Sequence, residues 1–205
     1  MQSTPELKRV TKAPREPGLA TTLLILAGIL GATIVILLLM GRPLICTCGT
    51  IKLWHGEVVS AENSQHISDW YTFSHVTHGF LFYWLAWLLS RWVSFFRPVR
   101  IRLMLAVIVE CGWEILENTD FIIERYREAT IALDYFGDSV LNSSFDVVFM
   151  SLGFLVASRL PALATLSLAV AFEVFMAIMI RDNLALNILM LVWPIEAVKT
   201  WQGAG

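Results

Sequence analysis

The chain has 205 residues, of which 57% are hydrophobic, and its mean hydropathy is +0.66. This composition excludes an ordinary soluble domain, which is more polar, and the formal net charge of −2 gives no reason to expect a nucleic-acid partner. The hydrophobic residues form continuous runs that approach the roughly 20 residues needed for a helix to cross a bilayer, and they do not alternate as strands would. The sequence therefore predicts an all-α, multi-pass membrane protein whose surroundings are the lipid bilayer.

In chain order, residues 1–18 come first and are polar, charged and proline-containing, so they are predicted to form a disordered cytoplasmic tail. Residues 19–205 are predicted to form a single transmembrane helical domain. Pro194 and Glu196 interrupt the last apolar run, so five spans plus an interfacial helix is the alternative to six. The six predicted spans cover residues 19–40, 70–90, 101–121, 140–158, 162–180 and 184–200.

The distribution of basic residues predicts the orientation. With six spans, ten of the fifteen lysines and arginines lie in the N-terminal tail, in the loop after the second span and in two later inner positions. Because positive residues concentrate on the cytoplasmic side, the N-terminus is predicted to be cytoplasmic. Loops 41–69 and 122–139 then face outward, and the predicted location is the cell inner membrane.

Five carboxylates lie within the predicted spans, and no lysine or arginine lies near the middle of these spans. Ionisable side chains in a bilayer are costly, so they indicate a functional site by default. Two histidines of the second span, His75 and His78, accompany them. The carboxylates are Glu110, Glu114, Glu117, Asp146 and Glu173.

Helical spacing places these groups on shared faces. Glu110, Glu114 and Glu117 stand at i, i+4 and i+7, which is one face of a helix. At about 1.5 Å of rise per residue, four residues from four helices reach a similar depth in the outer half of the membrane, namely His78, Glu114, Asp146 and Glu173. Glu110 lies apart from them, nearest the midplane. The sequence therefore predicts one outward-facing site that contains His78 and four acids, namely Glu114, Glu117, Asp146 and Glu173.

Two chemistries remain open for this site. Imidazole and carboxylate groups together bind Zn, Mn or Fe, and His75 and His78 are the candidate metal ligands with Glu114 and Asp146. Without a metal, crowded carboxylates share protons and act as acids or bases. The candidate catalytic residues are Glu114, Glu117, Asp146 and Glu173. Interhelical hydrogen bonds are the alternative for each residue alone.

Further candidate residues lie in and near the outer loops. Arg125, Arg127 and Arg181 are candidates for binding an anionic substrate, although a solvated turn is the favoured interpretation of each taken alone, because surface charge is common. Asp138 and Asn142 extend the polar face of Asp146 at i, i+4 and i+8 and are further candidates for substrate binding.

The outer loop 41–69 contains the pair Cys46 and Cys48. A disulfide, a metal site with His55 or His66, and redox chemistry are the three interpretations of this pair.

Several strings in the chain resemble a family of multi-pass inner-membrane proteins from alphaproteobacteria to which no activity is assigned. The resemblance extends from the first span nearly to the end and implies a location in the cell membrane. A weaker likeness, to VanZ-like envelope proteins, would use His78, Glu114, Arg125, Asp138 and Asn142. The strings that carry the first resemblance are CTCG (46–49), SQHISDWYTFSHVTHGF (64–80), WEILENT (113–119), YFGDSVLNS (135–143) and IRDN (180–183).

Three functions are compatible with these features. The first is an enzyme that acts on an envelope lipid or a lipid-linked substrate at the outer leaflet. The second is a proton- or cation-coupled transporter, although the chain is short and has no clear inverted repeat. The third is a non-enzymatic assembly or metal-handling subunit that uses Cys46 and Cys48.

Overall fold

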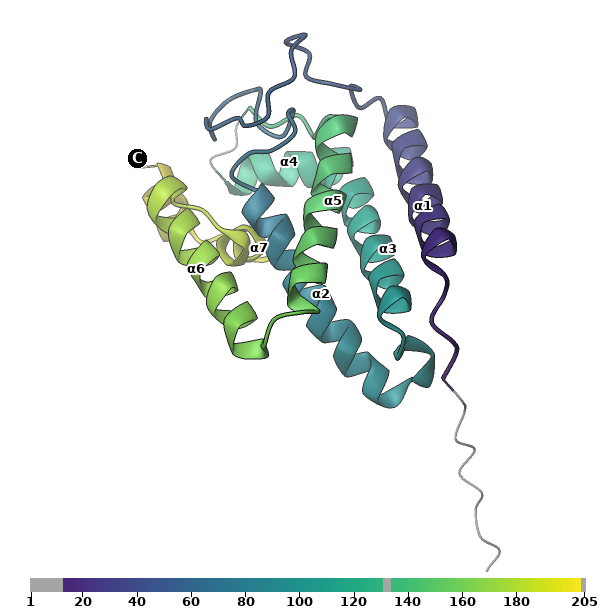
Figure 1. The fold of residues 1–205 in the computed structure, drawn as a ribbon. Helices are drawn as coiled ribbons and strands as arrows, with labels where there is room; N and C mark the ends of the chain where they lie inside the picture. The colour runs from purple at the N-terminus through teal and green to yellow at the C-terminus, as the bar shows by residue number, and fades with distance from the viewer. Residues whose placement is uncertain (1–12, 131–133, 204–205) are drawn as a thin grey trace, which may run out of the picture.

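In the computed structural model, which describes residues 13–130 and 134–203, the chain is built from helices and connecting loops (Figure 1). Five helices have 18 residues or more, and three are short. The elements are α1 (Leu19–Leu39), α2 (Thr72–Trp92), a 3-10 turn (Ser94–Phe96), α3 (Val99–Glu117), α4 (Asp120–Ala129), α5 (Val140–Ala157), α6 (Ala162–Ile180), α7 (Leu184–Val192) and α8 (Glu196–Gly203).

Three helices of the described chain are long and apolar enough to cross a membrane, namely α1, α5 and α6. Most of the side chains of α1 and α6 are not buried within the protein. Leu163 and Ile178 of α6, for example, are 75% and 73% exposed. Since a soluble protein rarely exposes so much apolar surface, these helices define a membrane-associated helical protein.

The helices α2 and α5 make the closest contact of the bundle. A Cβ atom on Gly79 of α2 would lie 2.1 Å from the carbonyl oxygen of Met150, and one on Gly153 of α5 would lie 2.2 Å from that of Val76. Only glycine permits two helix backbones to approach so closely. The core continues from α5 to α3, where Val107, Cys111 and Phe154 are buried.

Loop 40–71 crosses one end of the bundle, and α4 lies across the same end (Figure 1). Backbone hydrogen bonds attach this loop to the start of α5, since the amides of Ser139 and Val140 donate to the carbonyls of Ser64 and Pro43 at 3.0 and 2.9 Å. The described chain begins at the opposite end of the bundle (Figure 1). Thus the loop forms a cover over one end only.

The predicted sixth span is replaced by two short helices. Trp193 leaves the helical conformation, and Pro194, which lacks an amide hydrogen, separates α7 from α8. Gln202 of α8 then donates to Asp182 at 3.1 Å, at the position where the segment began. Residues 184–200 therefore do not form one continuous helix, and six spans are not confirmed.

The predicted outer loop 122–139 contains the last eight residues of α4. Thr119 accepts the amide of Ile122 and begins the helix, whose buried face carries Ile123, Tyr126 and Ala129. These residues recur every three positions, which is the spacing of an amphipathic helix. The density of charged residues hid this pattern in the sequence.

Part of the predicted tail has a defined structure. Glu16 accepts the amides of Val99 and Arg100 at 3.1 and 2.7 Å, at the first turn of α3. A carboxylate at this position satisfies amides that lack helical partners. Residues 13–18 are therefore packed against the bundle, and residues 1–12 lie outside the described residues.

Candidate functional site

Two histidines of α2 share one carboxylate of α3. The Nδ1 atom of His75 lies 2.7 Å from Oε1 of Glu110, and Nδ1 of His78 lies 3.1 and 3.2 Å from the two oxygens of the same side chain. The spacing of three residues places both rings on one face of α2. Glu110 is fully buried, so this arrangement fixes both imidazole rings within the bundle.

Two more carboxylates face His75 at greater distances. Its Nδ1 lies 3.7 Å from Oε1 of Glu114, and its Nε2 lies 3.8 Å from Oδ2 of Asp146 on α5. Both carboxylates are buried, and the ligand atoms of these three residues lie within 4.8 Å of one another. We call His75, His78, Glu110, Glu114 and Asp146 the His–carboxylate cluster.

The position of Glu110 corrects the sequence prediction. Counting residues along each predicted span placed it apart from the other acids. In the structure α2 crosses the bundle obliquely (Figure 1), so distance along a helix does not measure depth. Glu110 consequently contacts both histidines and lies at the centre of the cluster.

Several oxygen atoms of the cluster have no hydrogen-bond partner among the residues described. They are both side-chain oxygens of Glu114 and Oδ1 of Asp146. Buried polar atoms are almost always hydrogen-bonded in proteins. These three atoms therefore point to something that the protein side chains do not supply.

Two further acids continue the polar face toward the loops. Glu114, Glu117 and Asp138 have ligand atoms within 4.8 Å of one another. Asp138 accepts from the hydroxyl of Tyr135 and from Nδ2 of Asn118, both at 3.0 Å. Burial raises the pKa of Asp138 to about 6, although these two hydrogen bonds oppose the increase.

A cavity of about 280 Å³ lies beside the His–carboxylate cluster and the acids that continue its polar face. His75, His78, Asp146, Glu117 and Asp138 line one part of it. In the described chain no lysine or arginine lines the cavity. Polar residues of loop 40–71, including Asn63, Asp69 and Tyr71, also line it. One side of the wall is apolar and comes from α2, α3 and α7, and includes Leu81, Phe82, Val109, Trp113, Leu184 and Ile188.

Sequence reasoning missed Asn118. This side chain is fully buried and joins the end of α3 to Asp138 through both its amide nitrogen and its oxygen, the latter accepting the amide of Asp138 at 2.7 Å. The signal was present, because Asn118 follows Glu114 by four residues and continues its polar face.

Glu173 does not belong to this site, contrary to the prediction. Its carboxylate accepts the amides of Leu184 and Ala185 at 3.2 and 3.0 Å. These amides begin α7 and have no helical partners of their own. Glu173 therefore caps a helix, and it does not line the cavity.

The three predicted anion-binding arginines are also occupied elsewhere. Arg125 donates to the carbonyl of Leu191 at 2.9 Å, Arg127 to that of Tyr135 at 2.8 Å and Arg181 to that of Trp201 at 3.1 Å. These hydrogen bonds attach α4 to α7, α4 to the segment before α5, and the end of α6 to α8. Because they do not line the cavity, the structure gives no support to their binding a substrate there.

Asn142 lines the cavity but also has a structural role. Its Nδ2 donates to the carbonyl of His66 at 2.9 Å, and its amide donates to the cap residue Ser139. The side chain is buried. Asn142 thus attaches loop 40–71 to the start of α5.

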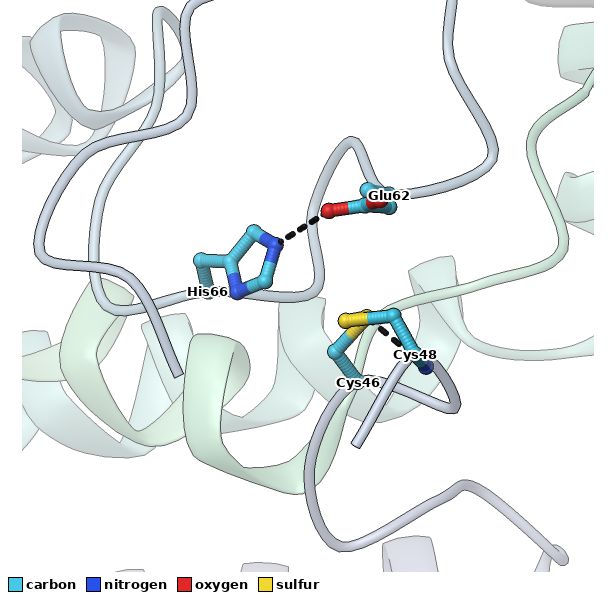
Figure 2. Close-up of side chains that lie close together, drawn as sticks. All are labelled: Cys46, Cys48, Glu62 and His66. Carbon is cyan, nitrogen blue, oxygen red and sulfur yellow. Dashed lines mark hydrogen bonds and ion pairs between the residues drawn. A yellow bond between two sulfur atoms is a disulfide. The ribbon is translucent and has the colours of Figure 1, made fainter. Parts of the chain in front are cut away.

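A second group of ligand-type residues lies within this loop (Figure 2). Cys46 and Cys48 form a disulfide, and Glu62 and His66 lie beside it, with one ligand atom of each of the four residues within 4.8 Å of the others. We call these four residues the Cys–His–Glu cluster. His55, the other predicted partner, lies beside His66 with the ring centroids 5.3 Å apart and the rings tilted by 44°.

Hydrogen bonds indicate which ring nitrogen of a neutral His66 carries the hydrogen atom. The amide of Lys52 lies 3.3 Å from its Nδ1 and donates to it, so a neutral ring carries its proton on Nε2. Nε2 lies 3.0 Å from Glu62 and donates to that carboxylate (Figure 2). Hydrogen bonds from Lys52 and His66 lower the pKa of Glu62 to about 2. Both nitrogen atoms of His66 are therefore engaged, which disfavours metal coordination by this ring.

The architecture defines the chain as a helical, membrane-associated protein with two clusters of ligand-type residues. The chain belongs to the family described as "Protein of unknown function (DUF2585)", whose family model matches residues 37–204. No solved structure matches the chain. The matching family is the one that the sequence strings indicated, whereas the likeness to VanZ-like proteins has no support from this match.

Relatives of the chain are alphaproteobacterial UPF0314 proteins of similar length. The chain is 57% identical to the UPF0314 protein of Rhizobium meliloti (strain 1021) over 183 residues, which is 89% of this chain and 91% of the relative. It is 59% identical to the one of Novosphingobium aromaticivorans over 175 residues, covering 85% and 88%. The protein of Rhizobium etli (strain CIAT 652) is 57% identical with the same coverage.

Proposed function

We propose that this protein is a multi-pass enzyme of the cell inner membrane that acts on an envelope lipid or lipid-linked substrate. The observation that carries the proposal is the cavity, because it joins the His–carboxylate cluster to an apolar wall contributed by three helices. A site of this kind suits a substrate with a long apolar part and a reactive polar group. No other part of the described chain combines these two features in one cavity.

The apolar wall supports entry of the substrate from the bilayer. Leu81, Val109 and Ile188 line the cavity and are 46%, 46% and 49% exposed. In a membrane such exposed apolar side chains face lipid. A lipid chain would therefore pass between α2, α3 and α7 while its polar group reaches the histidines.

The polar lining favours a neutral or cationic head group. Aspartate and glutamate line the cavity, and the described arginines that were expected to bind an anion are held by carbonyl groups outside it. An anionic group entering beside these acids would be repelled. A hydroxyl or amine is consequently the group best suited to react there.

His75 is the group best placed to transfer a proton. Glu110 orients its ring through Nδ1, and Nε2 faces Asp146 across 3.8 Å. A histidine held by a carboxylate in this way is the usual arrangement of a general base. Deprotonation of a substrate hydroxyl or amine is the step that this geometry supports.

The proposed orientation places the N-terminus in the cytoplasm and loop 40–71 outside. Basic residues lie at the end of the bundle that would face the cytoplasm and support this orientation. They include Arg15 before α1, and Arg97 and Arg100 where α2 connects to α3. The His–carboxylate cluster would then open toward the outer half of the membrane. With five crossings and the short helices α7 and α8 at the outer surface, the described part of residues 19–205 would form one membrane domain.

Envelope lipids of a deletion strain, compared with the parent by mass spectrometry, test the proposal. We expect at least one lipid species to accumulate, wild-type protein to reverse the change, and Glu110→Gln to leave it unreversed. Glu173→Gln is the matched control, since it changes an acid that caps α7 and does not line the cavity. An unchanged lipid profile, or full reversal by Glu110→Gln, would refute the proposal.

A pair of substitutions tests lateral entry separately. Val109→Trp fills the apolar wall, whereas Val148→Trp changes a 42% exposed valine of α5 that does not line the cavity. We expect only the first variant to block reversal of the lipid change. Equal behaviour of the two variants would exclude entry between α2, α3 and α7.

A further inference from the structure

We propose that the His–carboxylate cluster binds one divalent metal ion between Nε2 of His75, Asp146 and Glu114. The inference deepens the proposed function and rests on it for the role of the ion, whereas binding itself is measured without a substrate. It also changes the expectation from the sequence, in which both histidines were candidate ligands. Here Nε2 of His75 binds the ion, so a bound ion would replace the free His75 ring as the group that activates a substrate hydroxyl or amine, and His78 holds Glu110.

The orientation of His75 is the first argument. Glu110 lies 2.7 Å from Nδ1, and a carboxylate accepts, so Nδ1 carries the proton and Nε2 presents its lone pair. Histidines that bind metals commonly donate their other nitrogen to a carboxylate in this manner. Glu110 therefore occupies the position of an orienting residue behind a ligand.

The distance from Nε2 to Asp146 is the second argument. At 3.8 Å it exceeds a hydrogen bond. Ligands that lie about 2.0–2.2 Å from a common ion are separated by roughly 3–4 Å. The space between His75 and Asp146 is thus too wide for direct contact and has the width of two ligands on one ion.

The unpartnered oxygens are the third argument. Both oxygens of Glu114 and Oδ1 of Asp146 are buried without a hydrogen bond in the described chain, and no described lysine or arginine forms a salt bridge with the cluster. A proton on Glu114 would itself lack an acceptor. One cation, in contrast, satisfies oxygens from both side chains at once.

The ligand set indicates the class of ion. One imidazole nitrogen with several carboxylate oxygens suits Mn, Fe or Zn in the divalent state. One ligand atom from each of His75, Glu114 and Asp146 lies within 4.8 Å of the others. Oε1 of Glu114 lies 3.7 Å from Nδ1 of His75, so the Glu114 side chain must rotate toward Nε2 to share an ion with Asp146. Asp146 and Glu114 lie on different helices, so the ion would also join α5 to α3.

Titration of the full-length protein with Mn²⁺ tests the inference. The protein is purified in lipid nanodiscs, stripped with a chelator and followed by electron paramagnetic resonance and elemental analysis. We expect one Mn²⁺ per chain, with Asp146→Asn and Glu114→Gln each lowering the affinity at least about tenfold and Glu110→Gln lowering it by about 10–100-fold. Glu173→Gln is the control and should bind as the wild type does.

A spectroscopic measurement keeps the test valid if a variant fails to fold. Spin-echo spectra of Mn²⁺ bound to the wild type should show one coordinated imidazole nitrogen, and His66→Gln should leave that signal unchanged. Absence of saturable binding, absence of the nitrogen signal or its loss in His66→Gln would each overturn the inference. Unchanged affinity in folded Asp146→Asn and Glu114→Gln would do the same.

The two proposals fail separately. If Mn²⁺ binds as expected but Glu110→Gln fully reverses the lipid change, the enzyme proposal fails and the metal site stands. If no Mn²⁺ binds but Glu110→Gln leaves the lipid change unreversed, the metal site fails and acid–base chemistry by the cluster stands.

Discussion

The His–carboxylate cluster and the Cys–His–Glu cluster contain similar residue types but differ in how their polar atoms are satisfied. In the loop, His66 is hydrogen-bonded through both nitrogens and Glu62 is bonded to Lys52 and His66. In the bundle, three carboxylate oxygens have no partner among the described residues. Both clusters thus bring ligand-type residues close together. They differ because only the His–carboxylate cluster contains buried polar atoms without a hydrogen-bond partner, which is what distinguishes a candidate ligand site from a network whose hydrogen bonds are complete.

The two clusters also differ in what holds them. The loop cluster is formed by residues within 20 positions of one another, together with a disulfide. The His–carboxylate cluster combines three helices that meet through close packing. Perturbing helix packing should therefore affect the His–carboxylate cluster far more than the Cys–His–Glu cluster.

Gly79→Leu is expected to have the largest effect. A Cβ atom at this position would lie 2.1 Å from the carbonyl oxygen of Met150 and 2.5 Å from the amide nitrogen of Phe154, so α2 must separate from α5. We expect a loss of more than about 4 kcal/mol in the free energy of unfolding, which is diagnostic of severe overpacking. Thermal unfolding in detergent and the yield of folded protein measure it.

Gly28→Leu is the control for this change, because a Cβ atom at Gly28 of α1 meets nothing within 4 Å. It should unfold as the wild type does. Wild-type stability of Gly79→Leu would mean that α2 and α5 do not depend on their close approach, and the contrast between the clusters would lose its basis.

Asn118→Ala is expected to have the second largest effect. The substitution removes hydrogen bonds to Asp138 and to the carbonyl of Glu114 from a fully buried position. Leaving such partners unsatisfied costs about 1–3 kcal/mol. Chemical unfolding measures the loss, and Ser144→Ala, which removes only a bond to Val140 within α5, should cost less. Equal losses would show that Asn118 does not join α3 to the loop.

The sequence predicted the long helices well because length and continuous hydrophobicity are local properties. The predicted spans 19–40, 140–158 and 162–180 agree with α1, α5 and α6 to within one residue at each end. It also indicated that His75, Glu114 and Asp146 would lie near one another. Their roles as ligands or catalysts remain predictions.

What the sequence did not predict depends on contacts between distant segments. Glu110 became central because α2 is oblique to α3, which no spacing along one helix reveals. Glu173 and Arg181 were assigned to a site, although amides and carbonyls of the following segment bind them. The sequence alone does not distinguish a charged residue that hydrogen-bonds to backbone groups of another segment from one that binds a ligand.

Cys46→Ser with Cys48→Ser is expected to have a smaller effect than either change above. A disulfide that closes so short a loop contributes at most about 2 kcal/mol, and the hydrogen bonds of His66 do not involve it. We expect a modest decrease in thermal stability and unchanged Mn²⁺ affinity. A loss of Mn²⁺ binding in this double variant would place the metal in the loop and reverse the comparison between the clusters.

Glu62→Gln is expected to have the smallest effect, visible only in acid. Hydrogen bonds from Lys52 and His66 lower the folded-state pKa of Glu62 from 4.5 to about 2. Between these values the unfolded chain binds more protons than the folded one, so the contribution of Glu62 to stability is complete above pH 4.5 and is lost as the pH falls toward 2. Glu62→Gln should flatten this part of the stability profile, measured as the unfolding temperature against pH. Glu57→Gln, at an exposed position of the same loop, should leave the profile unchanged. If the unfolding temperature of Glu62→Gln depended on pH as that of the wild type does, the Glu62 carboxylate would not stabilise the loop. The complete hydrogen bonding that distinguishes the loop from the His–carboxylate cluster would then not be established.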